Sequence, residues 1–78
     1  MNNLETYKRI FIETLEIQEE QLQGLEYQGI ESWDSIGHMS LMASIEDTFQ
    51  IMLDMDDIID FSSFEKGKEI LRKYDVEF

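Results

Sequence analysis

Apolar residues recur at helical spacing in the first part of the chain. The residues that repeat every three or four positions are Leu4, Tyr7, Phe11 and Leu15, with Ile10 beside them. Residues spaced in this way share one face of a helix, and the positions between them are mostly polar. The pattern predicts an amphipathic helix over residues 3–16.

Residues 17–34 break this pattern. Gly24 and Gly29 interrupt the segment, and no helical or alternating period spans it. Its apolar residues are Leu22, Leu25, Tyr27 and Ile30, which would anchor the segment to a core. We therefore expect a long packed connection, with one helical turn near residues 19–22.

A second helix is predicted from Asp34 to about Phe49 or Gln50, because Asp is a favoured N-cap residue. At about 100° per residue, one face of this helix is assigned to the core. Its residues are Leu41, Met42, Ile45 and Phe49. A different side carries Ile36, Met39 and Ala43, grouped with Asp47 and close to Ser35 and Glu46. This second side is not needed for the core.

Two further helices are predicted in the last third of the chain. A short acidic one covers about Met55 to Asp60, with Ile58, Ile59 and Phe61 as its apolar contacts. The last one opens either with Ser62 and Glu65 at capping-box spacing or with Ser63 as the cap. Its apolar side is formed by Phe64, Gly67, Ile70 or Leu71, and Tyr74.

No segment shows the sustained alternation of a strand. Three longer helices, one short helix and a long first connection predict an all-α four-helix bundle. The 78 residues suffice for one small domain, residues 1–78, and make a large enclosed active site improbable.

Cysteine is absent, so neither disulfides nor a thiolate zinc site can form, and thiol chemistry would need an imported thiol. No metal site is expected elsewhere in the chain. The first residues lack a secretory signal pattern, and no apolar run approaches membrane-spanning length. We expect a monomeric cytoplasmic protein.

The formal net charge is −12, and its distribution is uneven. No lysine or arginine occurs from Ile10 to Glu65. Such a field repels nucleic acid and anionic membranes and attracts basic protein surfaces. Solubility alone is the simpler explanation of the charge.

The segment WDSIGHMSLM raises two interpretations of Ser35. In the first, Asp34 caps the helix and Ser35 only fills the first turn. In the second, the serine is a site for an attached phosphate, since helix N-termini favour phosphate groups. The apolar face of Ile36, Met39 and Ala43, rimmed by acids, resembles a docking surface and favours the second interpretation.

The chain resembles the acyl carrier proteins over nearly its whole length. The likeness rests on WDSIGHMSLM, the IEDTF that follows, SFEKGKEIL near the end, and the helix order and acidity. This resemblance implies that Ser35 receives 4′-phosphopantetheine from coenzyme A through a phosphodiester, and that Asp34 caps the helix and is read by a phosphopantetheinyl transferase. The arm would supply the missing thiol and carry acyl groups as thioesters.

The resemblance also implies a surface for partner enzymes that load and process the acyl group through basic docking surfaces. The residues expected there are Ile36, Met39, Ala43, Glu46, Asp47, Asp54, Asp56 and Asp57. Gly37 and Ser40 depart from the fatty-acid carriers, which often have a polar or acidic residue at these positions. The Trp-Asp-Ser start resembles free-standing carriers of specialised polyketide, peptide, polysaccharide or small-acid pathways.

Three other interpretations compete with a carrier. The chain could be an acidic helical adaptor that binds a basic partner without a prosthetic group. Asp34, Ser35 and His38 could form a hydrolytic group, but His38 is expected to project toward the core side, near Trp33, so no enzymatic activity is predicted. Asp54, Asp56 and Glu65 match calcium-loop positions, yet Ile58 and Ile59 replace a ligand and the turn glycine, leaving at most loose divalent binding.

Overall fold

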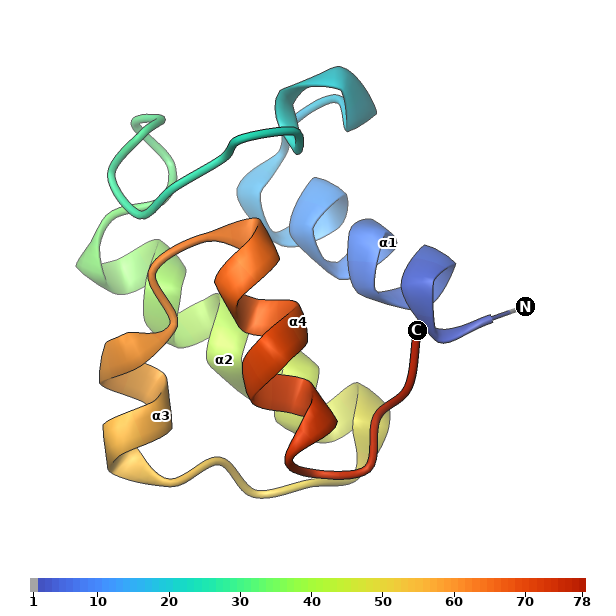
Figure 1. Ribbon diagram of the computed structural model, residues 1–78. Helices are drawn as coiled ribbons and strands as arrows, with labels where there is room; N and C mark the ends of the chain where they lie inside the picture. The colour runs from blue at the N-terminus through green and yellow to red at the C-terminus, as the bar shows by residue number, and fades with distance from the viewer. Residues whose placement is uncertain (1) are drawn as a thin grey trace.

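The computed structural model describes residues 2–78, which fold into a small all-helical bundle (Figure 1). Its elements are α1 (Asn3–Leu15), the 3₁₀ turn η1 (Glu19–Gln21), α2 (Ser35–Phe49), α3 (Met55–Asp60) and α4 (Phe64–Arg72). Within these residues, the strand-type pairing is limited to one antiparallel bridge between Glu26 and Ser63. The all-α prediction is confirmed, as is the turn expected near residues 19–22.

The helix boundaries are set by capping residues that the sequence displays. The side chains of Asn2, Asp34 and Ser63 each accept a backbone N–H from the first turn of the helix that follows. Ser63, and not Ser62, therefore caps α4, which decides between the two predicted alternatives. The C-cap residues of α1 and α2 are Glu16 and Gln50, and both adopt the left-handed conformation that commonly closes a helix.

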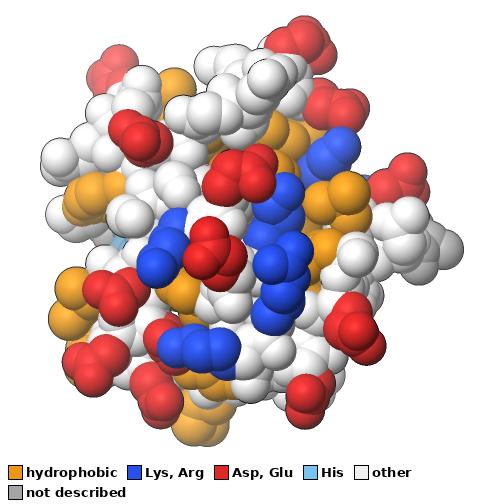
Figure 2. All heavy atoms as spheres, in the orientation of Figure 1, with side chains coloured by type: hydrophobic (Ala, Val, Ile, Leu, Met, Phe, Trp, Pro, Cys, Tyr) orange, Lys and Arg blue, Asp and Glu red, His pale blue; other side chains and the backbone are white. Residues whose placement is uncertain are grey.

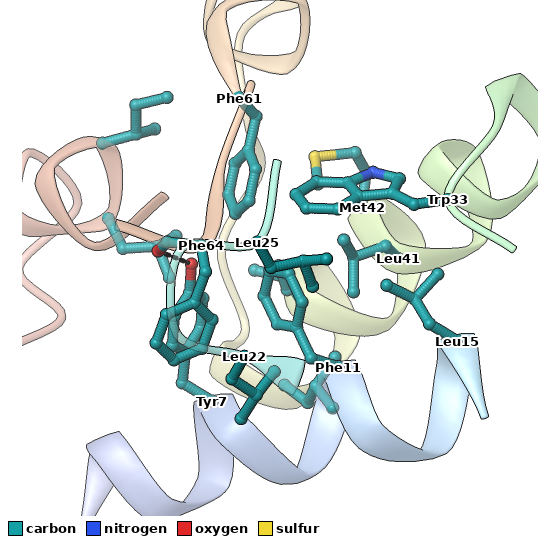
Figure 3. Packing of buried hydrophobic residues seen from close by; sticks show 14 of the residues in the cluster. Tyr7, Phe11, Leu15, Leu22, Leu25, Trp33, Leu41, Met42, Phe61 and Phe64 are labelled. Carbon is teal, nitrogen blue, oxygen red and sulfur yellow. Dashed lines mark hydrogen bonds between the residues drawn. The ribbon is translucent and has the colours of Figure 1, made fainter. Parts of the chain in front are cut away.

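A cluster of aromatic rings forms the centre of the core (Figure 3). Phe11 is completely buried and lies at its middle. Its ring centroid is 5.0 to 6.3 Å from those of Tyr7, Phe64, Trp33 and Phe61. These rings come from α1, the first connection and both ends of the α3–α4 turn, so one cluster joins all these segments. Edge-on and offset ring pairs of this kind add to the stabilisation from burial.

α4 approaches α1 at Gly67. A Cβ atom at this position would lie 2.2 Å from both the Tyr7 hydroxyl and the Phe61 ring, so only glycine fits without rearrangement. The Tyr7 hydroxyl donates a 2.7 Å hydrogen bond to the carbonyl of Phe64, drawn as a dashed line in Figure 3. Burial, followed by the charge of Glu65, raises the pKa of Tyr7 well above its ordinary value.

α2 packs against α1 with the face predicted for it. Leu41, Met42 and Ile45 are buried, and Phe49 is partly buried against the same cluster. α3 lies at the edge of the molecule away from α1, beside the first half of α2 (Figure 1). The start of α2 is thus left at the surface between the long first connection and α3, and the candidate site lies there.

Candidate functional site at the start of α2

The connection that leads to α2 is fixed by backbone pairing with the α3–α4 turn. The Tyr27 N–H donates to the Ser62 carbonyl at 2.8 Å, and the Phe64 N–H donates to the Leu25 carbonyl at 2.9 Å. Leu22, Leu25 and Trp33 bury their side chains beneath this pairing. The predicted packed connection is confirmed, and it holds the start of α2 in place.

Gly37 permits the sharp approach of this connection to α2. A Cβ atom at Gly37 would lie 2.0 Å from the backbone carbonyl oxygen of Ser32, a distance that no side chain can occupy. The Gly37 N–H also donates to the Asp34 carboxylate at 2.8 Å. Gly37 departs from the residue type common in carriers, and the close approach of the Ser32 carbonyl explains why glycine is needed here.

Ser35 is exposed in the first turn of α2. Its neighbour Asp34 uses one carboxylate oxygen for the Gly37 N–H and its backbone carbonyl for the His38 N–H at 2.7 Å. The Ser35 Oγ lies 3.3 Å from the Tyr27 hydroxyl. The capping role predicted for Asp34 is confirmed, and it leaves the exposed Ser35 hydroxyl next to that of Tyr27.

His38 lies between α2 and α3, where both of its ring nitrogens are used. Nδ1 accepts a 2.9 Å hydrogen bond from the indole N–H of Trp33. Nε2 therefore carries the proton and donates to the Ile58 carbonyl at 2.8 Å. The predicted position near Trp33 is confirmed. With both nitrogens occupied in this way, neither is hydrogen-bonded to Ser35, as a hydrolytic group would require.

An apolar groove of about 420 Å³ opens beside Ser35, between α2 and α3. Its walls include Met39 from α2 and Met55, Ile58 and Ile59 from α3. Phe61, which is buried, forms part of its base. Met42 and Ile45 are completely enclosed in the core and do not line the groove. The cavity is thus a surface feature and not an extension of the core.

The apolar residues predicted for a docking surface are exposed. Ile36 retains 79% of its surface and Met39 retains 58%, and Ala43 is exposed on the same helix. Ile59 was expected as an apolar contact of the short helix, but it is 70% exposed across the groove, and Met55 beside it is 72% exposed. Sequence reasoning did not assign either residue to the docking surface. Their position in a short acidic helix with several apolar residues was the available signal, but only the packing of α3 shows which of these residues face outward.

The predicted docking acids fall into two groups. Asp47, Asp54 and Asp56 are exposed, as a docking role requires. Glu46 is half-buried, and its carboxylate accepts the Leu53 N–H at 2.8 Å, which ties the α2–α3 connection to α2. Asp57 is 6% exposed. The expectation that Asp57 faces partners therefore does not fit its position, because its side chain points inward.

Asp57 joins α3 to the end of α4. Its two carboxylate oxygens accept hydrogen bonds from the Lys73 ammonium and from the Tyr74 hydroxyl. The hydrogen bond from Lys73, followed by that from Tyr74, lowers the pKa of Asp57 below its ordinary value. The same pairing raises the pKa of Lys73. Together with the His38 bond to Ile58, this contact fixes α3 beside the groove.

None of the residues that line the groove carries a positive charge. The basic residues of the last helix and its end are Lys66, Lys68, Arg72 and Lys73. Figure 2 shows lysine and arginine side chains gathered over α4 in the front of the view, with acidic side chains around them. Ser35 and the groove lie in the part of the chain that contains no lysine or arginine. A cationic partner surface would therefore meet little like-charge repulsion there.

Two kinds of feature are absent from residues 2–78. No helix in this range is both long enough and apolar enough to cross a bilayer. The same residues contain no group of three or more histidine or acidic side chains placed to share a metal ion. The positions compared with a calcium loop instead form α3 and the beginning of α4.

The chain was also compared with known proteins. No protein-family model matches it, and no curated protein matches it.

Proposed function

We propose that the chain is a carrier protein that is modified on Ser35 and presents the attached group to partner enzymes. The observation that supports this proposal best is the combination at the start of α2. An exposed serine hydroxyl lies at the mouth of an apolar groove, and exposed Ile36 and Met39 follow it on the same helix. A serine that only filled a helix turn would require neither the groove nor the exposed apolar residues.

More specifically, we propose an acyl carrier protein that carries 4′-phosphopantetheine on Ser35. It would serve a specialised pathway and not general fatty-acid synthesis. Attachment would form the bond between the Ser35 Oγ and a phosphorus of coenzyme A. It would break the pyrophosphate bridge, release adenosine 3′,5′-bisphosphate, and pass the hydroxyl proton to a base of the transferase. When bound, the arm supplies a thiol that holds acyl groups as thioesters.

The residues of this chain fit such a group in three respects. Asp34 holds the first turn of α2 closed without using the Ser35 hydroxyl. The exposed position of Ser35 allows a transferase to reach the Oγ. The groove offers an apolar surface next to the attachment point. Exposed Asp54 and Asp56 at the start of α3, and Asp47 near the end of α2, add negative charge for basic partner surfaces.

Intact-mass measurement after incubation with coenzyme A and a phosphopantetheinyl transferase of broad specificity tests the proposal. The expected result is one added phosphopantetheine in the wild type and none in Ser35→Ala. Ser40→Ala, which removes another exposed hydroxyl of α2, is the matched control and should be modified normally. An unmodified wild type, or an adduct that persists in Ser35→Ala, would favour the acidic adaptor instead.

A further inference from the structure

Tyr27 brings a second hydroxyl to the proposed modification site. Its oxygen lies 3.3 Å from the Ser35 Oγ, although the two residues belong to different segments. We propose that Tyr27 is a positioning residue whose O–H donates a hydrogen bond to the phosphate attached at Ser35 and fixes its orientation. This inference rests on the proposed function, because it concerns the phosphodiester that modification would create.

The position of Tyr27 is fixed independently of Ser35. Its backbone N–H is bonded to the Ser62 carbonyl at 2.8 Å, next to the bridge between Glu26 and Ser63. Its ring lies edge-on to His38, with the centroids 5.2 Å apart, and to Trp33, with the centroids 6.2 Å apart. The hydroxyl is therefore held at the mouth of the groove by contacts that do not involve the serine. A group fixed in advance loses little freedom when it binds.

The distance between the two hydroxyls indicates that their own hydrogen bond is weak. Hydroxyl pairs usually approach to about 2.7 to 2.8 Å, and 3.3 Å lies beyond that range. Modification would remove the Ser35 proton and place charged phosphate oxygens beyond the Oγ. A charged oxygen is a stronger acceptor than an ester oxygen, so the Tyr27 O–H would turn toward the phosphate.

The donor available to a phosphate on Ser35 is a neutral hydroxyl, because an acidic residue and no cationic one adjoins this serine. Asp34 adjoins Ser35, and none of the residues that line the groove is a lysine or arginine. The Asp34 carboxylate is already bonded to Gly37. A tyrosine hydroxyl can donate to the phosphate without adding to the positive or negative charge of a surface that partners must recognise.

The test uses the full chain modified with coenzyme A and a phosphopantetheinyl transferase of broad specificity. Intact mass first establishes that the wild type, Tyr27→Phe and Ser62→Ala each carry the group. Phosphorus-31 NMR then compares the three proteins. We expect the resonance of Tyr27→Phe to move by more than its line width, because the phosphate loses a donor. The Phe ring keeps the contacts with His38 and Trp33, so the fold should be retained.

Ser62→Ala is the matched control, since it removes a different hydroxyl that lines the same groove. Its phosphorus resonance should stay within one line width of the wild type. Steady-state modification kinetics provide a second readout. We expect the kcat of Tyr27→Phe to fall by about threefold to tenfold, the effect of one exposed hydrogen bond, with the KM for the carrier nearly unchanged.

The outcomes separate this inference from the proposed function. A modified Tyr27→Phe protein whose phosphorus resonance coincides with that of the wild type overturns the role of Tyr27 and leaves the carrier function intact. A shift of equal size in Ser62→Ala also overturns it, since the change would then reflect the groove and not a specific donor. A wild type that gains no mass overturns the proposed function, and the role of Tyr27 with it.

Discussion

The two sides of the bundle hold their helices by different means. α1 is attached through buried rings around Phe11 and through the close approach of Gly67 to Tyr7. α3 exposes Met55 and Ile59, and beside the packing of Ile58 and Phe61 against the core it is held by the polar contacts of Asp57 and His38. Apolar packing is insensitive to charge, whereas hydrogen-bonded ion pairs depend on protonation. α3, which forms one wall of the groove, is thus the helix whose attachment depends more strongly on pH.

Truncation of the Phe11 ring should give the largest difference in stability between the α1 side and the groove side. Phe11→Ala removes a completely buried side chain that contacts four other rings. We expect it to lower the free energy of unfolding by about 3 to 5 kcal/mol. Met39→Ala on the groove side should change it by less than about 0.5 kcal/mol. Urea denaturation of both variants measures the contrast, and equal losses would contradict it.

Gly37→Ala should give the next largest effect. Helix propensity alone favours alanine over glycine by about 1 kcal/mol in a helix interior. The Cβ atom would lie 2.0 Å from the Ser32 carbonyl oxygen, so we expect a net destabilisation of about 1 to 3 kcal/mol. Ser40→Ala, an exposed change in the same helix, is the control. Thermal and urea denaturation show whether the variant is more or less stable than the wild type. A stabilised Gly37→Ala would show that the connection near Ser32 can move away from the new Cβ atom at little cost.

The Asp57 contact should make the α3 side sensitive to acid. A lowered pKa contributes stability that is present above the ordinary value of 3.8 and is lost as the pH falls through the lowered value. Asp57→Asn should therefore show a shallower loss of stability below this pH than the wild type. Urea denaturation over a range of pH measures the slope. Asp56→Asn, an exposed neighbour, should retain the steeper wild-type profile.

Ile36→Ala should have the smallest effect on folding. The side chain is 79% exposed, so the free energy of unfolding should change by less than about 0.5 kcal/mol. If Ile36 contacts partners, the same variant should slow modification by a phosphopantetheinyl transferase severalfold, because an apolar contact at the interface is lost. A large loss of stability with an unchanged rate would place Ile36 in a structural role.

Most of the secondary structure could be predicted because its signals are local. Asp34 was predicted as a cap, and its carboxylate acts within one helical turn, so α2 begins directly after it. For α4 the sequence offered Ser62 or Ser63, and the structure decided for Ser63. The packing of His38 against Trp33 was also predictable, since both residues belong to one short segment that must bury an indole ring. The exposure of Ser35 followed from the same local geometry.

The roles of the acids could not be predicted in the same way. Asp54, Asp56 and Asp57 look equivalent in an acidic segment, yet only the Asp57 carboxylate accepts hydrogen bonds from Lys73 and Tyr74. Asp54 meets Tyr74 through its backbone N–H instead. The Glu46 carboxylate similarly accepts a hydrogen bond from the Leu53 N–H, which lies in the connection to α3. Tyr27 was expected to be only an apolar anchor, and its hydroxyl reaches Ser35 across eight positions of the sequence. Each of these contacts depends on how separate segments meet.

The sequence by itself determined the helices, the Asp34 cap, the buried stripes and the resemblance that singles out Ser35, because period and capping act over a few residues. Only the tertiary structure decided what surrounds that serine. It brought Tyr27 beside Ser35, turned Asp57 inward, and opened the groove between α2 and α3. These features arise from contacts between segments distant along the chain, and such contacts are fixed by packing of the whole core and not by any local pattern.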